Sequence, residues 1–153
     1  MRIGDYFSCY DIVPHLISTT KKEVLEELTE KLLAGHSEID RDEVFRVLLE
    51  RELLGSTGIG GGIALPHAKL KHVGSPLVVF GRSTTGIAYD ALDGRPVKLF
   101  FLLVADTDSV DLYLTLLARI SRLLKDRVLR NRLLEAADAN ALYEIIQEQD
   151  NRL

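Results

Sequence analysis

Apolar residues recur at helical spacing in two segments near the start of the chain. The first helix is expected to begin at Thr20, whose spacing to Glu23 is that of a capping box, and to end at Gly35, a common C-terminal residue. A second capping pair, Asp40 and Glu43, opens another helix that runs up to a glycine-rich stretch. Both helices have apolar residues at helical spacing: Val24, Leu25, Leu28 and Leu32 in the first, and Val44, Val47 and Leu48 in the second.

The pattern changes to consecutive apolar residues in the middle of the chain. Residues 77–80 and 97–104 predict buried strands, and the second run is apolar enough to be a central strand covered on both faces. Residues 83–86 predict a turn between them. A short edge strand is expected at residues 11–17, because Pro14 cannot donate a hydrogen bond to a central ladder.

Helical spacing returns in the last third of the chain. Residues 112–124 carry a wide apolar stripe that favours packing on a sheet. Two further amphipathic helices are expected at residues 126–137 and 139–149. Helices therefore surround the predicted strands, which indicates an α/β protein with a mixed β-sheet flanked by α-helices, built as a single domain over residues 1–153.

Composition excludes several classes of function. The net charge is −4 and no basic run is present, so a nucleic-acid partner is not expected. No apolar run approaches the roughly 20 residues of a membrane span, so membrane insertion is not expected either. Cys9 is the only cysteine, which excludes an internal disulfide and fits a cytoplasmic location. The chain has no cysteine and histidine at the close spacing that is typical of a metal site, so no metal is expected. No other cofactor is expected either.

The chain's most unusual stretch is a glycine cluster: five of the 11 glycines lie between positions 55 and 62. Such density predicts a special backbone path. A Walker A loop is excluded because Gly61 stands where lysine is required after Gly60. The dinucleotide pattern fails as well, since Ile63 and Leu65 occupy the positions of its last glycine.

A phosphate group remains compatible with this stretch. Glycine-rich backbone can present N–H groups to an anion, and Ser56 and Thr57 add hydroxyls. Arg51 offers a planar fork of donors that suits phosphate oxygens, and His67 offers a nucleophilic imidazole. The residues alone leave other interpretations open: a mobile loop, a solvated arginine at a helix end, and a structural histidine at a strand end.

The same residues resemble the signature of a known family. The stretch from Arg51 through the glycines to Leu65, Pro66 and His67 is similar to the fructose/mannitol-type (type-2) enzyme IIA domain of the bacterial phosphoenolpyruvate-dependent phosphotransferase system. Residues 87–97 and the leucine-rich helix after them resemble the same family, so the resemblance covers nearly the whole chain.

The resemblance implies roles for individual residues. His67 matches the histidine that accepts a phosphoryl group from a histidine-containing phosphocarrier protein, and Arg51 matches the arginine that helps to hold it. Ser56 and Thr57 lie in the matching loop and are expected on the phosphate side. Tyr113 stands where many members carry a second histidine, and a tyrosine can donate a hydrogen bond there but cannot be a cation.

Within the family, a chain without a permease is most similar to the nitrogen-regulatory enzyme IIA. We therefore expect a phosphohistidine carrier that signals through phosphorylation-dependent binding of regulated target proteins. One alternative is a sugar-specific (fructose or mannitol) IIA subunit that passes phosphate to a separate permease. Another is a protein-interaction module that is not phosphorylated, an interpretation supported only by Tyr113 in place of the second histidine.

Overall fold

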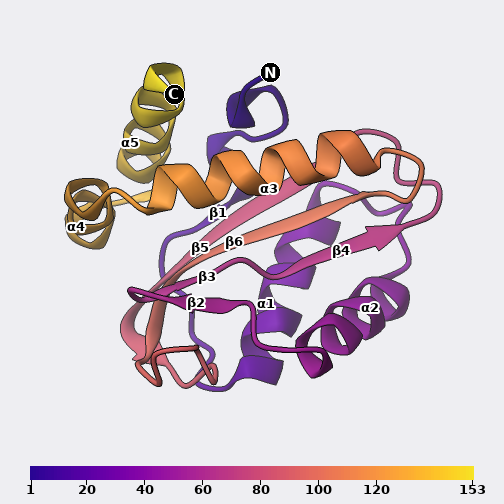
Figure 1. The fold of residues 1–153 in the computed structure, drawn as a ribbon, viewed down its shortest axis with the longest axis horizontal. Helices are drawn as coiled ribbons and strands as arrows, with labels where there is room; N and C mark the ends of the chain where they lie inside the picture. Colours follow the sequence, from indigo (N-terminus) through magenta and orange to yellow (C-terminus); the bar gives the residue numbers. More distant parts are fainter.

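A mixed β-sheet with helices on both faces forms the frame of the molecule in the computed structural model, which describes residues 1–153 (Figure 1). The α/β class predicted from the sequence is confirmed. After two short 3-10 turns, the elements in chain order are β1 (Ile12–Val13), α1 (Lys21–Ala34), α2 (Arg41–Leu53), β2 (Gly58–Gly60), β3 (Ile63–Ala64), β4 (His67–Leu70), β5 (Leu77–Ile87), β6 (Val97–Asp106), α3 (Val110–Leu124), α4 (Arg127–Glu135) and α5 (Ala139–Arg152).

Strand β6 organises the sheet. The strand order is β1-β5-β6-β3-β2, and β4 also pairs with β6, next to β3 along the same edge. Strands β5 and β6 are antiparallel, whereas β3 and β4 run parallel to β6. The edge strand predicted beside Pro14 is confirmed as β1, which pairs in parallel with β5. The segment from β2 to β4 ends in β4, which pairs with β6. His67, the first residue of β4, is the pairing partner of Leu103 in β6.

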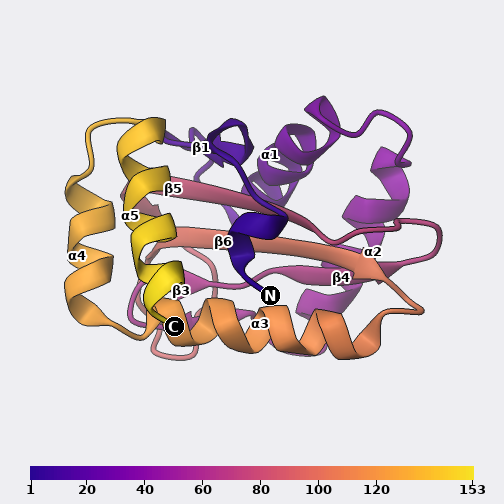
Figure 2. The same cartoon turned by 90° about the horizontal axis from the view of Figure 1, so that it is seen from above.

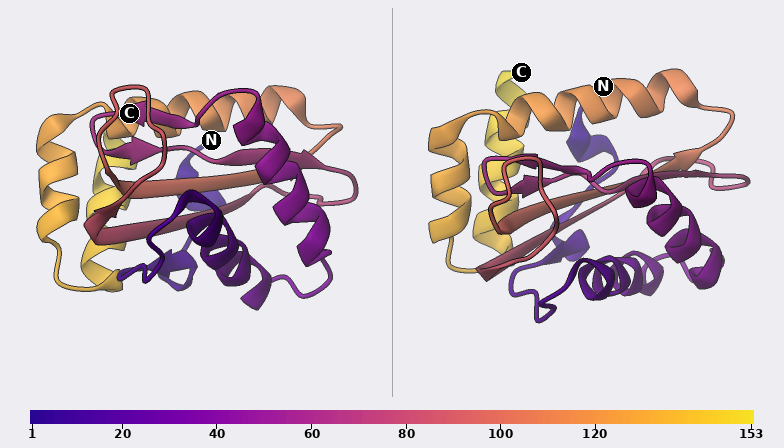
Figure 3. Two further views of the ribbon diagram at one scale, coloured as in Figure 1. Left: turned by 90° about the horizontal axis from the view of Figure 1, so that it is seen from below. Right: turned by 60° about the horizontal axis from the view of Figure 1, so that its bottom comes forward.

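The two faces of the sheet have separate hydrophobic cores. Leu99, Phe101 and Leu103 of β6 belong to the core under α3, α4 and α5, whereas Phe100 and Leu102 belong to the core under α1 and α2. Figure 3 shows α3 on one side of the sheet and α1 and α2 on the other. In Figure 2, α4 and α5 lie side by side at the end of the sheet away from α2. The expectation of a central strand covered on both faces is confirmed.

Local capping explains where the first two helices begin. The Thr20 hydroxyl accepts a hydrogen bond from the Glu23 amide at 3.2 Å, and the Glu23 carboxylate accepts from the Thr20 amide at 3.1 Å, as the capping box predicts. Asp40 caps α2 through its carboxylate, which accepts from the amides of Asp42 and Glu43. None of the five α-helices has the length and apolar character needed to cross a bilayer.

The turn predicted at residues 83–86 is wrong. Strand β5 continues through this segment to Ile87, which pairs with Val97 of β6. The pairing register shifts between Arg82 and Ile87, and Gly86 has a φ of 89°. The local turn preference therefore appears as an irregularity within a strand, because pairing with β6 at both ends keeps the segment in the sheet.

Candidate functional site

His67 is the first residue of β4, and its ring has a defined tautomer. The Nδ1 atom lies 2.6 Å from the carbonyl oxygen of Leu65. A carbonyl can only accept, so Nδ1 carries the hydrogen and the neutral ring keeps its lone pair on Nε2. The backbone after Leu65 is held to the sheet, because the Leu103 amide donates to the Pro66 carbonyl at 3.0 Å. The ring nitrogen of His67 that carries a lone pair is therefore Nε2.

Arg51 faces that atom from the last turn of α2. Its Nε–H donates to His67 Nε2 at 3.2 Å, and its Nη1 donates to the Gly55 carbonyl at 2.8 Å. The second terminal nitrogen, Nη2, makes no hydrogen bond within the chain. The structure thus brings together the two residues that the sequence marked at opposite ends of the glycine-rich stretch, and it leaves donors of the guanidinium available to a ligand.

The surroundings of His67 favour the uncharged imidazole. Burial lowers the pKa of His67 below its ordinary value, because the charged ring would lose hydration. The hydrogen bond to the Leu65 carbonyl raises the pKa of His67 and so opposes the effect of burial. The positive charge of Arg51 lowers the pKa further. The net direction is downward, so His67 is neutral at pH 7 and available as a nucleophile.

Tyr113, on the first turn of α3, forms the other side of the site. A cavity of about 390 Å³ is lined by Val47, Glu50, Arg51, Leu54, His67, Ala68, Lys69 and Tyr113. The ring centroids of His67 and Tyr113 are 5.8 Å apart, and Lys69 Nζ lies 5.6 Å from the centre of the tyrosine ring. Burial raises the pKa of Tyr113 to about 12, so its hydroxyl stays protonated at neutral pH and can donate a hydrogen bond.

The structure does not bring Ser56 or Thr57 to the wall of this cavity. Ser56 Oγ donates to the Tyr89 carbonyl at 3.2 Å and accepts from the Gly58 amide at 3.0 Å. Thr57 is buried, and its amide and hydroxyl both hydrogen-bond to the carboxylate of Glu52. Both side chains shape the loop from α2 to β2.

The glycine cluster has the special backbone conformation that the sequence predicts, but its glycines at 60–62 do not lie beside His67. Gly60, Gly61 and Gly62 have φ values of 97°, 68° and 78° and form the tip of the hairpin between β2 and β3. This tip points toward α4, away from α2 (Figure 1). Gly61 and Gly62 line a different cavity that shares no residue with the one at His67. The expectation that this glycine-rich backbone presents N–H groups to a phosphate beside His67 is therefore wrong for Gly60, Gly61 and Gly62, because strand pairing carries the tip away.

Sequence reasoning missed a buried polar cluster behind Arg51. Glu52 forms an ion pair with Lys21 at 3.0 Å, and Lys21 Nζ lies 4.7 Å from the centre of the Tyr89 ring. The signal was present in the period of α2, since Glu52 follows Val44 and Leu48 at intervals of four residues and so continues the buried stripe. A carboxylate at such a position indicates a buried partner.

These parts define the class of the site. It combines a neutral imidazole whose Nε2 lone pair accepts a hydrogen bond from Arg51, an arginine fork and a protonated phenol around one small cavity. Phosphoryl transfer to a nitrogen requires a positioned nucleophile and fixed positive charge more than further covalent chemistry. The arrangement therefore fits a histidine that accepts a phosphoryl group.

The chain belongs to the family of EIIA 2 domains of the phosphoenolpyruvate-dependent sugar phosphotransferase system, whose model matches residues 5–149. It is 39% identical over 148 residues to a nitrogen regulatory protein of Bradyrhizobium diazoefficiens, covering 95% of each chain. It is 37% identical over 150 residues to the fructose-specific EIIABC component of Bacillus subtilis, and this match spans 98% of the chain but only 24% of that longer protein.

A solved structure agrees with the fold. The crystal structure of the nitrogen regulatory protein IIA-Ntr from Neisseria meningitidis superposes with a TM-score of 0.88 at 30% sequence identity. The match covers 94% of this chain and 98% of that one. The family resemblance noted in the sequence is confirmed.

Proposed function

We propose that this protein is a phosphohistidine carrier and regulator of a phosphotransferase system, with His67 as the phosphorylated residue. The observation that carries the proposal is the hydrogen-bonding state of its ring. The Leu65 carbonyl holds the Nδ1 hydrogen, and Nε2 faces the Arg51 guanidinium at 3.2 Å. A lone pair is thereby directed at the place where an anionic group would be held by arginine.

The donor in this proposal is a histidine-containing phosphocarrier protein. Nε2 of His67 attacks the phosphorus, a new N–P bond forms, and the N–P bond of the donor breaks with its electron pair returning to the donor imidazole. The ring of His67 keeps its Nδ1 hydrogen, and the Leu65 carbonyl stabilises the positive charge that the ring acquires. Arg51 exchanges its contact with Nε2 for phosphoryl oxygens, and Tyr113 and Lys69 offer further donors from the same cavity.

The regulatory role follows from what the modification changes. A phosphoryl group adds close to two negative charges. At His67 these charges would lie among Arg51, Lys69 and the exposed Leu54. Target proteins that dock on this surface would therefore distinguish the two forms. The resemblance to nitrogen regulatory proteins over nearly the full length supports such signalling by protein binding.

The proposal is tested by phosphotransfer. The protein is incubated with phosphoenolpyruvate, the first enzyme of the system and a histidine phosphocarrier, and the bound phosphate is assayed for the acid lability and base stability of phosphohistidine. Wild type is expected to take up one phosphate, and His67→Ala none. His15→Gln is the matched control, since His15 is an exposed histidine outside the cavity. Equal labelling of His67→Ala, or no labelling of wild type while a partner still binds, would contradict the proposal.

A sugar-specific IIA role is the second candidate. It is favoured by the 37% identity to the EIIA-containing part of a fructose-specific component. In that role phosphate on His67 would continue to a separate permease and then to a sugar. Addition of membranes that contain a fructose-type permease, with labelled sugar phosphate as the readout, distinguishes this role from the regulatory one.

A further inference from the structure

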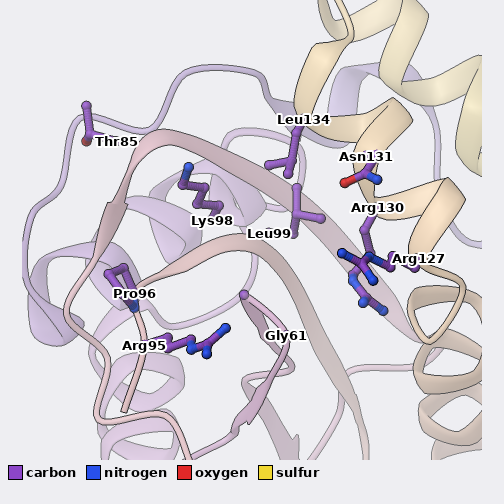
Figure 4. A pocket seen from close by; sticks show the side chains of 11 residues that line it. Gly61, Thr85, Arg95, Pro96, Lys98, Leu99, Arg127, Arg130, Asn131 and Leu134 are labelled. Carbon is purple, nitrogen blue, oxygen red and sulfur yellow. The ribbon is translucent and has the colours of Figure 1, made fainter. Parts of the chain in front are cut away.

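A second cavity, of about 740 Å³, lies at the far end of the hairpin that leads to His67. It is open to solvent and is lined by the tip of the hairpin, the end of β5, the segment that leads into β6, strand β6 itself and helix α4 (Figure 4). Its polar side chains are those of Thr85, Arg95, Lys98, Arg127, Arg130 and Asn131, and Gly61 adds backbone. The phosphohistidine proposal uses none of these residues, and none of them lines the cavity at His67.

The wall of this cavity is strongly basic, although the whole chain has a net charge of −4. Four cationic side chains line it, and no carboxylate does. None of the four forms an ion pair within the chain. Asp93 lies outside the wall, and its pKa is lowered because its carboxylate accepts hydrogen bonds from the amides of Arg95 and Gly61 and lies near the charge of Arg95. Lys98, Arg127 and Arg130 therefore contribute positive charge that no carboxylate of the chain pairs with.

The guanidinium of Arg130 is fixed in place before any ligand arrives. Its Nη1 donates to the carbonyls of Leu124 and Lys125 at 2.8 and 2.9 Å. It lies against the hairpin tip, where a Cβ at Gly61 would be 3.7 Å from Arg130 Cζ. Arg127 precedes Arg130 by three residues, so both project from one face of α4, and Arg95 extends toward Gly61 from the opposite side (Figure 4).

We propose that this cavity binds a small phosphate compound, such as pyrophosphate or a phosphorylated sugar, that carries at least two anionic groups. Planar guanidinium forks match phosphate oxygens, and charges held on opposite sides suit a ligand with an anion at each end. The volume is within the range of small-molecule sites. Only 2 of the 11 lining residues are hydrophobic, which favours a phosphorylated sugar or pyrophosphate over a ligand with a large apolar ring.

Isothermal titration calorimetry at about 0.15 M salt tests this site, with inorganic pyrophosphate and a hexose bisphosphate as probes and sulfate as the reference anion. At least one probe is expected to bind with a one-to-one saturable signal and more tightly than sulfate. Arg127→Gln should weaken it by about tenfold or more, the effect of losing a charge-assisted hydrogen bond. The side chain of Arg127 is exposed and forms no ion pair within the chain, so the variant should fold, which thermal unfolding verifies.

Arg132→Gln is the matched control. Arg132 lies on the same helix but outside the cavity, where it faces Glu148 at 3.6 Å, and its removal changes the net charge by the same amount. The proposal predicts nearly unchanged affinity for this variant. An equal loss in both variants, binding no tighter than that of sulfate, or no binding of either probe would overturn it. Because no step involves His67, failure here leaves the phosphotransfer proposal intact, and the reverse also holds.

Discussion

The guanidinium of Arg51 donates from Nε to Nε2 of His67 across 3.2 Å, so the nitrogen that we propose to be phosphorylated is already paired with the cation that we propose to hold the phosphoryl group. The second contact of Arg51, with the Gly55 carbonyl at 2.8 Å, fixes the side chain to the loop after α2. In the proposed transfer the phosphoryl group would bond to this same nitrogen, so Arg51 is already beside the reacting atom before the reaction. Its effect should therefore appear in the rate of transfer more than in folding.

Replacement of Arg51 tests this relationship. Arg51→Ala should slow phosphorylation of His67 by about 10²-fold, the typical effect of losing one fixed donor at a developing anion. Arg51→Lys should recover only part of the rate, because a single ammonium cannot bridge phosphoryl oxygens as a fork does. Rates are measured by rapid quench with a labelled phosphocarrier. Arg46→Ala, on the solvent side of α2, is the control, and an equal slowing in that variant would refute the assignment.

The lowered pKa of His67 predicts its pH dependence. Burial favours the neutral ring in the folded protein, so the folded pKa lies below the value of about 6.5 expected in the unfolded chain. The associated stability is complete above pH 6.5 and is lost as the pH falls through the folded pKa. NMR titration of the His67 ring should give a midpoint below 6.5, and Arg51→Gln should raise it. A wild-type midpoint at or above 6.5 would contradict the burial argument.

Tyr113 provides a test that separates its hydroxyl from its ring. The ring is buried, whereas the hydroxyl makes no hydrogen bond within the chain and is not among the buried unpaired groups. Tyr113→Phe should therefore leave the melting temperature nearly unchanged and slow phosphorylation by about tenfold, through loss of a donor to a charged oxygen. Tyr113→Ala should in addition destabilise the fold by about 3 kcal/mol, through the cavity it leaves. An unchanged rate in the Phe variant would exclude a role for the hydroxyl.

The parts of the fold that were predictable from the sequence depend on local chemistry. Thr20 caps α1 through Glu23, which is only three positions away. Strand β6 is buried on both faces, and this appears in the sequence as a continuous apolar run. Segment 83–86 contradicted its local turn pattern because its structure is decided by pairing with β6, a partner that a local pattern does not specify.

The candidate site likewise has features that the local sequence predicts and features that depend on the fold. His67 and Arg51 were recognisable as residue types in a motif, but their contact spans 16 positions and needs the sheet to bring α2 beside β4. The hydroxyls of Ser56 and Thr57 have the chemistry to bind phosphate, yet the structure engages them with Tyr89 and Glu52. Composition identifies donors, and only the fold decides which of them stay free for a ligand.

Gly58 is a position where even one methyl group should be costly. A Cβ there would lie 2.9 Å from both Cα and Cβ of Ala91, and backbone cannot withdraw as a flexible side chain can. Gly58→Ala should therefore lower the free energy of unfolding by about 2 kcal/mol, measured by urea denaturation. Gly35→Ala is the control, since nothing lies within 4 Å of its Cβ position and its φ is −100°. Equal stability of the two variants would refute the close approach.

Glu52 connects stability to the geometry of Arg51. Its carboxylate is paired with Lys21 and accepts the amide and hydroxyl of Thr57, so it fixes the loop whose Gly55 carbonyl anchors Arg51. Glu52→Ala leaves these partners unpaired in a buried place and should cost about 3 kcal/mol in urea denaturation. The same variant should slow phosphorylation, because the loop no longer fixes the arginine.

Glu52→Gln separates the two effects. Its amide oxygen still accepts from the Thr57 backbone, so most of the loop geometry and most of the transfer rate should return, while the ion pair with Lys21 stays lost. Glu50→Ala is the control at the neighbouring position, where an exposed pair with Arg46 is worth less than about 1 kcal/mol. If Glu52→Ala unfolds at the same urea concentration as Glu50→Ala, the buried carboxylate does not hold the loop. If it is destabilised but transfers phosphate at the wild-type rate, the loop does not position Arg51.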